Sequence, residues 1–241
     1  MVVKSEIKLV KNLQQKKYRN QHRLFVAEGC KTVQEVLSSG FTPKVLYSTD
    51  KNALPDHEDL ITLIGEKTLE RMSGLKTPNK ILAVFEIPKT TALPTKGWVI
   101  ALDGVKDPGN MGTLIRLCDW FNIAHVVCAA DTVDCYNPKV VQATMGSIAR
   151  VRVHYTDLTS FLLDFPGESY GAVLNGLPIQ DAQFPKAGVL VLGSESHGIS
   201  PDVQRTISHQ ISIPQIGNSS ADSLTVATAT AIFLHEIRRS Q

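Results

Sequence analysis

Three segments in the second half of the sequence combine tight turns with polar and charged side chains. The first follows an apolar run ending at Asp103, crosses a turn rich in glycine and proline, and reaches Asn110 and Arg116. We expect Asn110 at the N-cap of a helix, where a side-chain oxygen accepts from unpaired N–H groups. Arg116 would then lie on that helix beside Gly112, whose missing side chain leaves room near the guanidinium. The alternative is a capped surface helix with a solvated arginine.

The second segment, residues 191–200, is an apolar run followed by a tight turn with Glu195 at its tip. Neither segment is a Walker phosphate loop, because the required Lys-Ser or Lys-Thr pair is missing. The second is not a nucleophile elbow either, since that motif places serine where Glu195 stands. His197 could act as a base, although a histidine in a turn is more often merely solvated.

The third segment begins with Ile213-Pro214 and contains a loop rich in Ser and Asn at 218–222. From Ser223 onward, alanines alternate with β-branched residues, and Arg238 and Arg239 suit the C-terminal end of a helix. We therefore expect a helix with small side chains that permit close packing. A buried packing helix alone does not explain the polar loop that precedes it.

The elements that must position these segments indicate an α/β protein. Downstream of a loop rich in Pro and Thr, strand-like runs alternate with helical patterns, which favours βαβ units and a mainly parallel sheet. Upstream, a helix at 30–39 and strands at 44–47 and 80–87 indicate a smaller α/β domain. We place domains at 1–92 and 98–241, joined by a linker at 93–97. The downstream runs cover 98–102, 125–128, 151–154, 171–174, 189–192 and 210–213.

The composition is that of a folded globular chain. It has 241 residues, of which 43% are apolar and 20% charged, and this excludes a disordered tail, a collagen repeat and a coiled coil. The longest apolar runs have strand length, so we expect no membrane span. No apolar leader opens the sequence, which predicts a cytoplasmic location. Four widely spaced cysteines suggest neither a zinc site nor a disulfide framework, so we expect no metal and mostly buried thiols.

Positive charge is concentrated near the N-terminus. Residues 1–92 carry 15 Lys and Arg against 10 Asp and Glu, whereas the remainder has a net charge of −3. Such side chains can neutralise nucleic-acid phosphates, although a solvated helix face has the same composition. The candidate contacts are Lys16, Lys17, Arg19 and Arg23.

Taken together, the three segments resemble the SpoU (TrmH) family of RNA ribose 2′-O-methyltransferases in the SPOUT superfamily. The first motif matches Asp-Pro-Gly-Asn-x-Gly followed by an arginine, the second Gly-x-Glu-x-x-Gly, and the third Ile-Pro, a glycine-containing loop and a Ser-Leu-x-Val segment. The match spans about residues 98–238. Residues 17–29 and 75–78 more weakly resemble the small RNA-substrate-binding domain of that family.

The resemblance implies a parallel-sheet domain with a deep C-terminal trefoil knot, an exception to the rule against threaded chains. It also implies methyl transfer from S-adenosylmethionine to a ribose 2′-hydroxyl of ribosomal or transfer RNA, in a homodimer. The implied catalytic residues are Arg116, Asn110, Glu195 and Ser223. The implied donor contacts are Gly193, Ile213 and Leu224.

The third motif departs from the family pattern. Thr225 stands where asparagine is usual, and the loop before Ser223 is about two residues longer than the commonest form. A threonine hydroxyl can donate and accept hydrogen bonds, so it replaces part of the hydrogen bonding of an asparagine amide. The alternative function is a non-catalytic RNA-binding or assembly protein that keeps this fold. A small-molecule enzyme with a doubly wound sheet would leave the basic N-terminal segment without a role.

Overall fold

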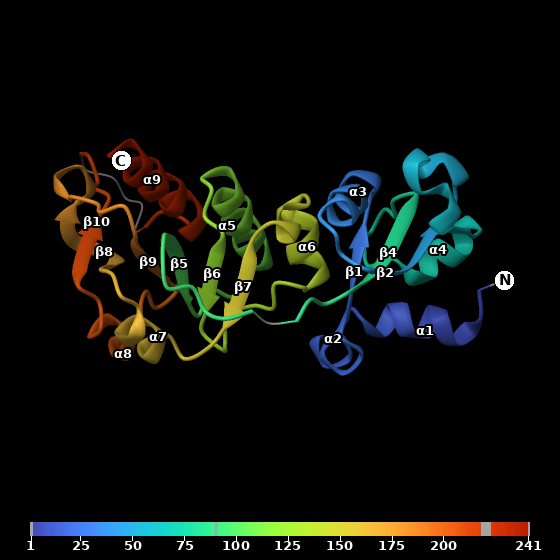
Figure 1. The fold of residues 1–241 in the computed structure, drawn as a ribbon, viewed down its shortest axis with the longest axis horizontal. Coiled ribbons are helices and arrows are strands. Elements are labelled where there is room, and N and C mark those ends of the chain that lie inside the picture. Colours follow the sequence, from blue (N-terminus) through green and yellow to red (C-terminus); the bar gives the residue numbers. More distant parts are fainter. Residues whose placement is uncertain (1, 90, 218–222, 241) are drawn as a thin grey trace. The chain divides into compact units, whose positions relative to one another are not determined.

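The computed structural model describes residues 2–89, 91–217 and 223–240, which form two compact units (Figure 1). The first unit contains residues 1–89 and 134–150, and the second contains residues 90–133 and 151–241. The chain therefore passes between the units after Lys89, after Val133 and after Arg150. The domain boundaries expected from the sequence, 1–92 and 98–241, describe parts that would fold independently. These boundaries stay a prediction.

A parallel sheet forms the middle of the second unit. Across the described ranges its strands run in the order β10-β8-β9-β5-β6-β7, and each neighbouring pair is parallel. The six runs expected as strands are confirmed. Their bounds are β5 (Trp98–Asp103), β6 (His125–Cys128), β7 (Arg152–Tyr155), β8 (Ser169–Pro178), β9 (Gly188–Gly193) and β10 (His209–Ser212).

Helices cover both faces of this sheet, as its apolar strands require. Figure 1 shows α5 (Pro108–Trp120) and α9 (Val226–Arg239) on one side, and α7 (Leu158–Asp164) and α8 (Pro201–Gln204) on the other. A short 3₁₀ helix, η4 (Ile179–Asp181), follows β8. Fully burying one large aliphatic or aromatic side chain contributes about 1.5–3 kcal/mol. One buried core cluster includes Val99, Ala101, Val191, Phe161 and Leu162.

The first unit is a smaller α/β structure, as expected. Its sheet has the order β1-β4-β2-β3, in which only the β2–β3 pair is parallel within the described residues. The expected helix and both expected strands of this part are confirmed. The strands are β1 (Leu24–Glu28), β2 (Pro43–Ser48), β3 (Ile61–Leu63) and β4 (Ile81–Glu86). The helices are α1 (Lys4–Asn12), α2 (Lys16–His22), η1 (Lys51–Ala53), η2 (Pro55–Leu60), α3 (Cys30–Ser38) and α4 (Glu66–Met72).

Residues 134–150 complete the first unit with α6 (Pro138–Thr144) and η3 (Ser147–Ala149). The α/β class, the parallel sheet and the smaller preceding α/β unit are confirmed. After edge strand β10 the chain returns to α9, which packs on α5 and β9. Such a return is consistent with the expected knot, which stays a prediction. Within the ranges described, no helix is both long and apolar enough to cross a membrane.

Candidate active site

The first two motifs meet because their strands are neighbours. Asp103, the last residue of β5, is the register partner of Gly193, the last residue of β9. Since the strands are parallel, the segments that follow them leave from the same edge of the sheet, where ligands bind in open α/β sheets. The third motif leaves that edge after β10.

Asp107, and not Asn110, caps α5. The Asp107 side chain accepts a hydrogen bond of 2.7 Å from the Asn110 backbone N–H, and Pro108 occupies the first helical position. The N-cap expectation for Asn110 is therefore wrong. An aspartate followed by proline is a common helix start and was the available signal. Because the cap is supplied by Asp107, the Asn110 side chain is left for another partner.

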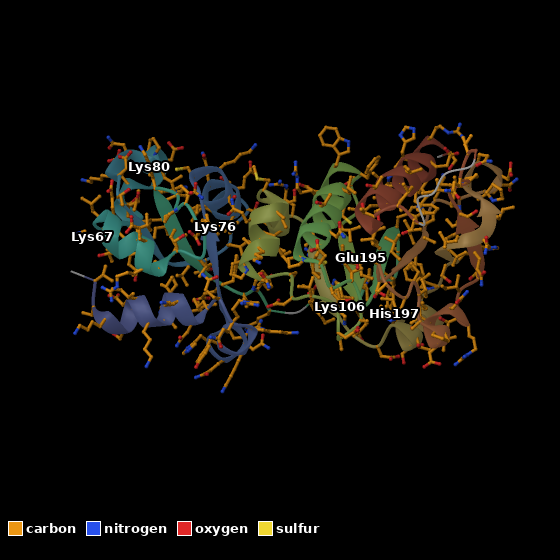
Figure 2. All side chains as sticks on the ribbon, turned by 180° about the vertical axis from the view of Figure 1, so that it is seen from behind. Lys67, Lys76, Lys80, Lys106, Glu195 and His197 are labelled. Carbon is orange, nitrogen blue, oxygen red and sulfur yellow. The ribbon has the colours of Figure 1, made fainter. Side chains whose placement is uncertain are left out.

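The second motif forms a closed turn at the end of β9. Ser194 and Gly198 exchange backbone hydrogen bonds of 3.0 and 2.9 Å, and Gly198 adopts a φ of +67°. The His197 N–H donates to Ser194 Oγ at 3.2 Å. Figure 2 labels exposed Glu195 and His197 on this turn. The turn thus presents a carboxylate and an imidazole from a rigid backbone.

A hydrogen bond joins the two motifs. Asn110 Nδ2 donates to Glu195 Oε1 at 2.7 Å, although the residues are 85 positions apart. Arg116 lies two turns further along α5, exposed and without a hydrogen-bond or ion-pair partner in the described part of the chain. The site therefore combines a fixed amide–carboxylate pair with an available guanidinium.

The third motif is partly outside the described residues, because its loop at 218–222 is not described. Ile213 is half-buried, whereas Ser223 and Leu224 are exposed just before α9. The helix begins at Val226, three residues later than expected, and it ends at Arg239. Its last turn carries Arg238 and Arg239, in agreement with the sequence pattern.

Thr225 is the N-cap of α9. Its hydroxyl accepts from the Thr228 N–H at 3.3 Å and lies 2.9 Å from the Thr228 hydroxyl oxygen. Asparagine is an equally good N-cap residue. The substitution in the third motif therefore preserves the start of this helix.

Removing the cap should destabilise the protein. We expect Thr225→Ala to lower the free energy of unfolding by about 1 kcal/mol and Thr225→Asn to leave it nearly unchanged. Urea unfolding measures both. Equal stability of the alanine variant and the parent would show that this hydroxyl contributes nothing to α9.

Gly193 permits a close approach of two backbone segments. A Cβ at this position would lie 2.0 Å from the Gly198 carbonyl carbon and 2.2 Å from the Ile199 nitrogen. A side chain at 193 would thus collide with the turn itself. The apolar side chains of Ile216 and Leu224, which are 92% and 49% exposed, flank the undescribed loop.

Two contacts that hold the loops of the site were not predicted from the sequence. Asp103 Oδ2 accepts from the Ser200 N–H at 2.7 Å, which ties the end of β5 to the second motif. Lys106 Nζ donates to the backbone oxygen of Asp131 at 2.6 Å and forms an ion pair with its carboxylate. The sequence contains no signal for either contact, because both depend on the strand order.

Arg19 is not available to a nucleic acid. The whole residue is 1% exposed, and its guanidinium donates to Asp134 Oδ2 and to the carbonyls of Leu13 and Gln14. Arg19 therefore leaves the set of proposed RNA contacts. The sequence showed its charge but not its burial.

The other basic candidates are on the surface. Lys16 and Lys17 are exposed in α2, and the Lys17 ammonium lies 6.0 Å from the centre of the Tyr18 ring. Arg23 is exposed at the end of α2 and donates to the Pro88 carbonyl at 2.7 Å.

Neither thiols nor metal ligands form a second site among the described residues. Cys118, Cys128 and Cys135 are buried and Cys30 is exposed. Burial raises the pKa of the Cys118 thiol in α5, so it stays protonated. Within the described ranges, no three His, Cys, Asp or Glu side chains gather as metal ligands.

Two family models match most of this chain. The model of the SpoU rRNA methylase family matches residues 97–235, and that of the MRM3-like substrate binding domain matches residues 4–83. The chain is 31% identical over 242 residues to the 23S rRNA (guanosine(2553)-2′-O)-methyltransferase RlmP of Bacillus subtilis. This alignment covers 97% of this chain and 96% of that relative.

Two solved structures extend the likeness to three dimensions. A TrmH-family protein from Porphyromonas gingivalis has 37% identity and a TM-score of 0.92 over the whole of both chains. An AdoMet-bound rRNA methyltransferase from Sinorhizobium meliloti has 28% identity and a TM-score of 0.88, over 99% of this chain and 96% of that one.

The fold and the site define an α/β protein that places a polar site at the carboxyl ends of parallel strands. The family match covers more than half of this chain, and the relative from B. subtilis matches nearly all of it. The chain belongs to the SpoU rRNA methylase family.

Proposed function

We propose that this chain transfers a methyl group from S-adenosylmethionine to a ribose 2′-hydroxyl of ribosomal RNA. The observation that carries this proposal is the Asn110–Glu195 hydrogen bond at the start of α5, the helix that also carries the exposed Arg116. The relatives support it, because their names describe ribose methylation of rRNA and a structure with bound AdoMet.

Arg116 is the proposed catalytic residue. A guanidinium only donates hydrogen bonds and accepts none, so it is a poor general base. We assign it to clamping a substrate phosphate and stabilising the negative charge that develops on the 2′-oxygen. The departing proton then passes to that phosphate or to solvent.

Asn110, Glu195 and Ser223 are proposed to orient the substrate. The Asn110–Glu195 bond fixes the turn after β9 against the start of α5, which holds the wall of the site in place. Ser223 is exposed before α9 and offers a hydroxyl to the ribose. A rigid site lowers the entropic cost of aligning the reacting atoms.

Gly193, Ile213 and Leu224 are the proposed contacts of the methyl donor. The donor supplies a methyl group bonded to a positively charged sulfur, which needs no metal to be transferred. The chain supplies backbone groups at the end of β9 and apolar surface around Leu224. Exclusion of water from these contacts favours a step in which opposite charges are neutralised.

A homodimer is part of the proposal. Trp120 at the end of α5 is 84% exposed, and Ile232 of the neighbouring α9 is 38% exposed. Large exposed apolar side chains on adjacent helices indicate an interaction surface, and a second copy of the chain would cover them. We also propose a cytoplasmic location, which fractionation of cells would test.

Lys16, Lys17 and Arg23 are the proposed RNA contacts of the first unit. Replacing Lys16 and Lys17 together by alanine should weaken RNA binding and reduce its salt dependence. The slope of log K against log salt should fall by about 0.7 for each lost contact with a single strand, or about 0.9 with a duplex.

A matched variant separates these contacts from general charge effects. Lys44 and Lys67 are also exposed lysines of the first unit, and replacing both removes the same charge. We expect this control to change the slope less. Equal slopes in the two variants would remove Lys16 and Lys17 from the RNA interface.

Transfer of a labelled methyl group tests the function directly. Purified protein, labelled S-adenosylmethionine and ribosomal RNA from a deletion strain should give label in a 2′-O-methylated nucleotide, and mapping would identify it. RNA from the parent strain should accept little label, because its site is already methylated. RNA binding without transfer would favour the non-catalytic alternative, which the family relationships do not support.

A further inference from the structure

Residues 134–150, which we call the strap, lie inside the stretch matched by the SpoU methylase family but fold with the first unit. In that unit α6 packs against β1. The Tyr136 ring lies 4.7 Å from that of Phe25, which belongs to β1. The strap is therefore an integral layer of the first unit.

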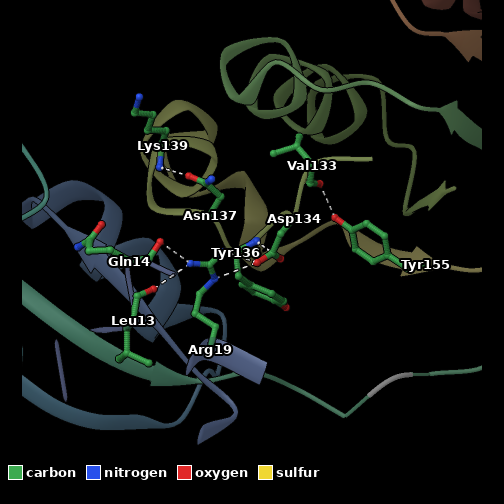
Figure 3. A network of polar contacts seen from close by, with 9 residues as sticks. All are labelled: Leu13, Gln14, Arg19, Val133, Asp134, Tyr136, Asn137, Lys139 and Tyr155. Carbon is green, nitrogen blue, oxygen red and sulfur yellow. Dashed lines mark hydrogen bonds and ion pairs between the residues drawn. The ribbon is translucent and has the colours of Figure 1, made fainter. Parts of the chain in front are cut away.

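A buried ion pair holds the start of the strap (Figure 3). Arg19 Nε and Nη2 donate to Asp134 Oδ2 at 2.9 and 2.5 Å, and Nη1 donates to the carbonyls of Leu13 and Gln14 at 2.9 and 3.0 Å. The side chains of Arg19 and Asp134 are only 2% and 13% exposed. Asp134 Oδ1 also accepts from the Tyr136 N–H at 3.0 Å. The pair thus joins the strap to the turn between α1 and α2.

A more exposed ion pair lies at the end of the strap. Arg150 and Glu35 form an ion pair of 2.6 Å, but their side chains are 42% and 39% exposed. Exposed pairs of this kind contribute little to stability. The Arg19–Asp134 pair is consequently the stronger polar attachment of the two.

The chain is also anchored just before the strap. In the second unit, Tyr155 Oη donates to the Val133 carbonyl at 2.7 Å. The peptide bond between Val133 and Asp134 is thus flanked by one anchor in each unit. Together with the crossings after Lys89 and after Arg150, this means that the units are not joined by a single flexible linker.

We propose that Arg19 and Asp134 are positioning residues for methyl transfer: through the strap, their pair fastens the RNA-binding unit to the unit that carries the catalytic site. A buried arginine fork has a defined geometry, and loss of one partner leaves an uncompensated charge. RNA held by the first unit is thereby kept tethered, through residues 134–150, to the unit that carries Arg116. This inference rests on the proposed function, because it requires that the first unit binds the substrate.

Cleavage of the chain tests the fastening without any need for activity. A protease site inserted between Thr95 and Lys96, both exposed, separates residues 1–95 from 96–241, and the strap stays on the second fragment. After cleavage in native buffer, the fragments should co-elute in gel filtration. Charge reversal by Asp134→Arg should release them, whereas Glu35→Gln should not. Separation of the unmodified fragments would overturn the proposal.

Turnover of the uncut protein tests the positioning. We expect Asp134→Leu to lower kcat by up to about 10²-fold, because small displacements of reacting groups have effects of this size. The Kd values for S-adenosylmethionine and for RNA should stay within twofold of the parent. Asp134→Asn keeps the shape and one acceptor oxygen, but it replaces the second acceptor with an NH2 donor and removes the charge. Its loss of kcat should be smaller but measurable. Glu35→Gln is the control.

The outcomes are distinguishable. Parental kcat in both Asp134 variants would overturn the positioning role, and so would a parallel loss of kcat and RNA affinity, which marks a merely structural defect. Where Asp134→Leu does not fold, Asp134→Asn decides the question alone. An inactive parent protein would contradict the proposed function, while the gel filtration would still report on the strap.

Discussion

Replacing Arg116 by alanine should slow methyl transfer by about 10²–10³-fold at saturating RNA, the usual effect of removing one preorganised group from a reaction centre. The side chain is exposed on α5 and has no partner among the described residues, so folding should not suffer. The proposed donor contacts, Gly193, Ile213 and Leu224, lie in other segments, and calorimetry should therefore give an unchanged affinity for S-adenosylmethionine. Single-turnover transfer measures the rate.

Arg116→Lys is the sharper form of this experiment. Lysine keeps the charge but lacks the planar fork that can hold a phosphate and a ribose oxygen together, so we expect nearly the same loss. Arg205→Ala is the matched control, because Arg205 is an exposed arginine near α8 that is paired with Asp202. If saturating RNA restores parental turnover to either Arg116 variant, then Arg116 only binds substrate.

Gly193→Ala should abolish both donor binding and transfer. The structure directs a side chain at this position into the Gly198 and Ile199 backbone. Even a methyl group must displace the turn after β9, and because this turn carries Glu195, we expect the Asn110–Glu195 bond to be disturbed. We expect at least a 10²-fold loss of transfer, on the scale of about 1 Å of misplacement, and no measurable heat of donor binding.

Gly198→Ala separates this collision from backbone strain. Gly198 has a positive φ of +67°, but open space surrounds its Cβ position. Alanine there costs about 1–2 kcal/mol of conformational energy and adds no collision. The loss of transfer should therefore be clearly smaller than for Gly193→Ala. Equal effects in the two variants would mean that the close approach at Gly193 is not what preserves the site.

The strands of the second unit were predictable because burial on both faces leaves unbroken apolar runs in the sequence. The motif residues Asn110, Arg116 and Glu195 were identified through the resemblance to the SpoU family, and their roles stay proposals. The N-cap of α5 was predicted wrongly because two candidate residues lie close together. Asp107 and Asn110 can both cap a helix, and only the backbone shows that Asp107 does.

Predicting RNA contacts from basic residue types alone was the weakest inference, because the sequence does not show which side chains are buried. Lys17 and Arg19 are two positions apart in the same basic run, yet one is exposed and the other is enclosed. The difference arises from helix geometry, which turns neighbouring side chains to opposite faces, and from a carboxylate at position 134. No pattern within the first 23 residues could identify that partner.

The sequence by itself determined the α/β class, the six strands of the parallel sheet and the motif residues, because these depend on periodicity and on residue types that are local in the chain. Only the tertiary structure decided that β9 lies beside β5, that Glu195 therefore reaches Asn110, and that residues 134–150 fold with the first unit. The Asn110–Glu195 contact joins residues 85 positions apart, and the Arg19–Asp134 contact joins residues 115 positions apart. Their partners are selected by strand order and burial, which are properties of the whole packed chain.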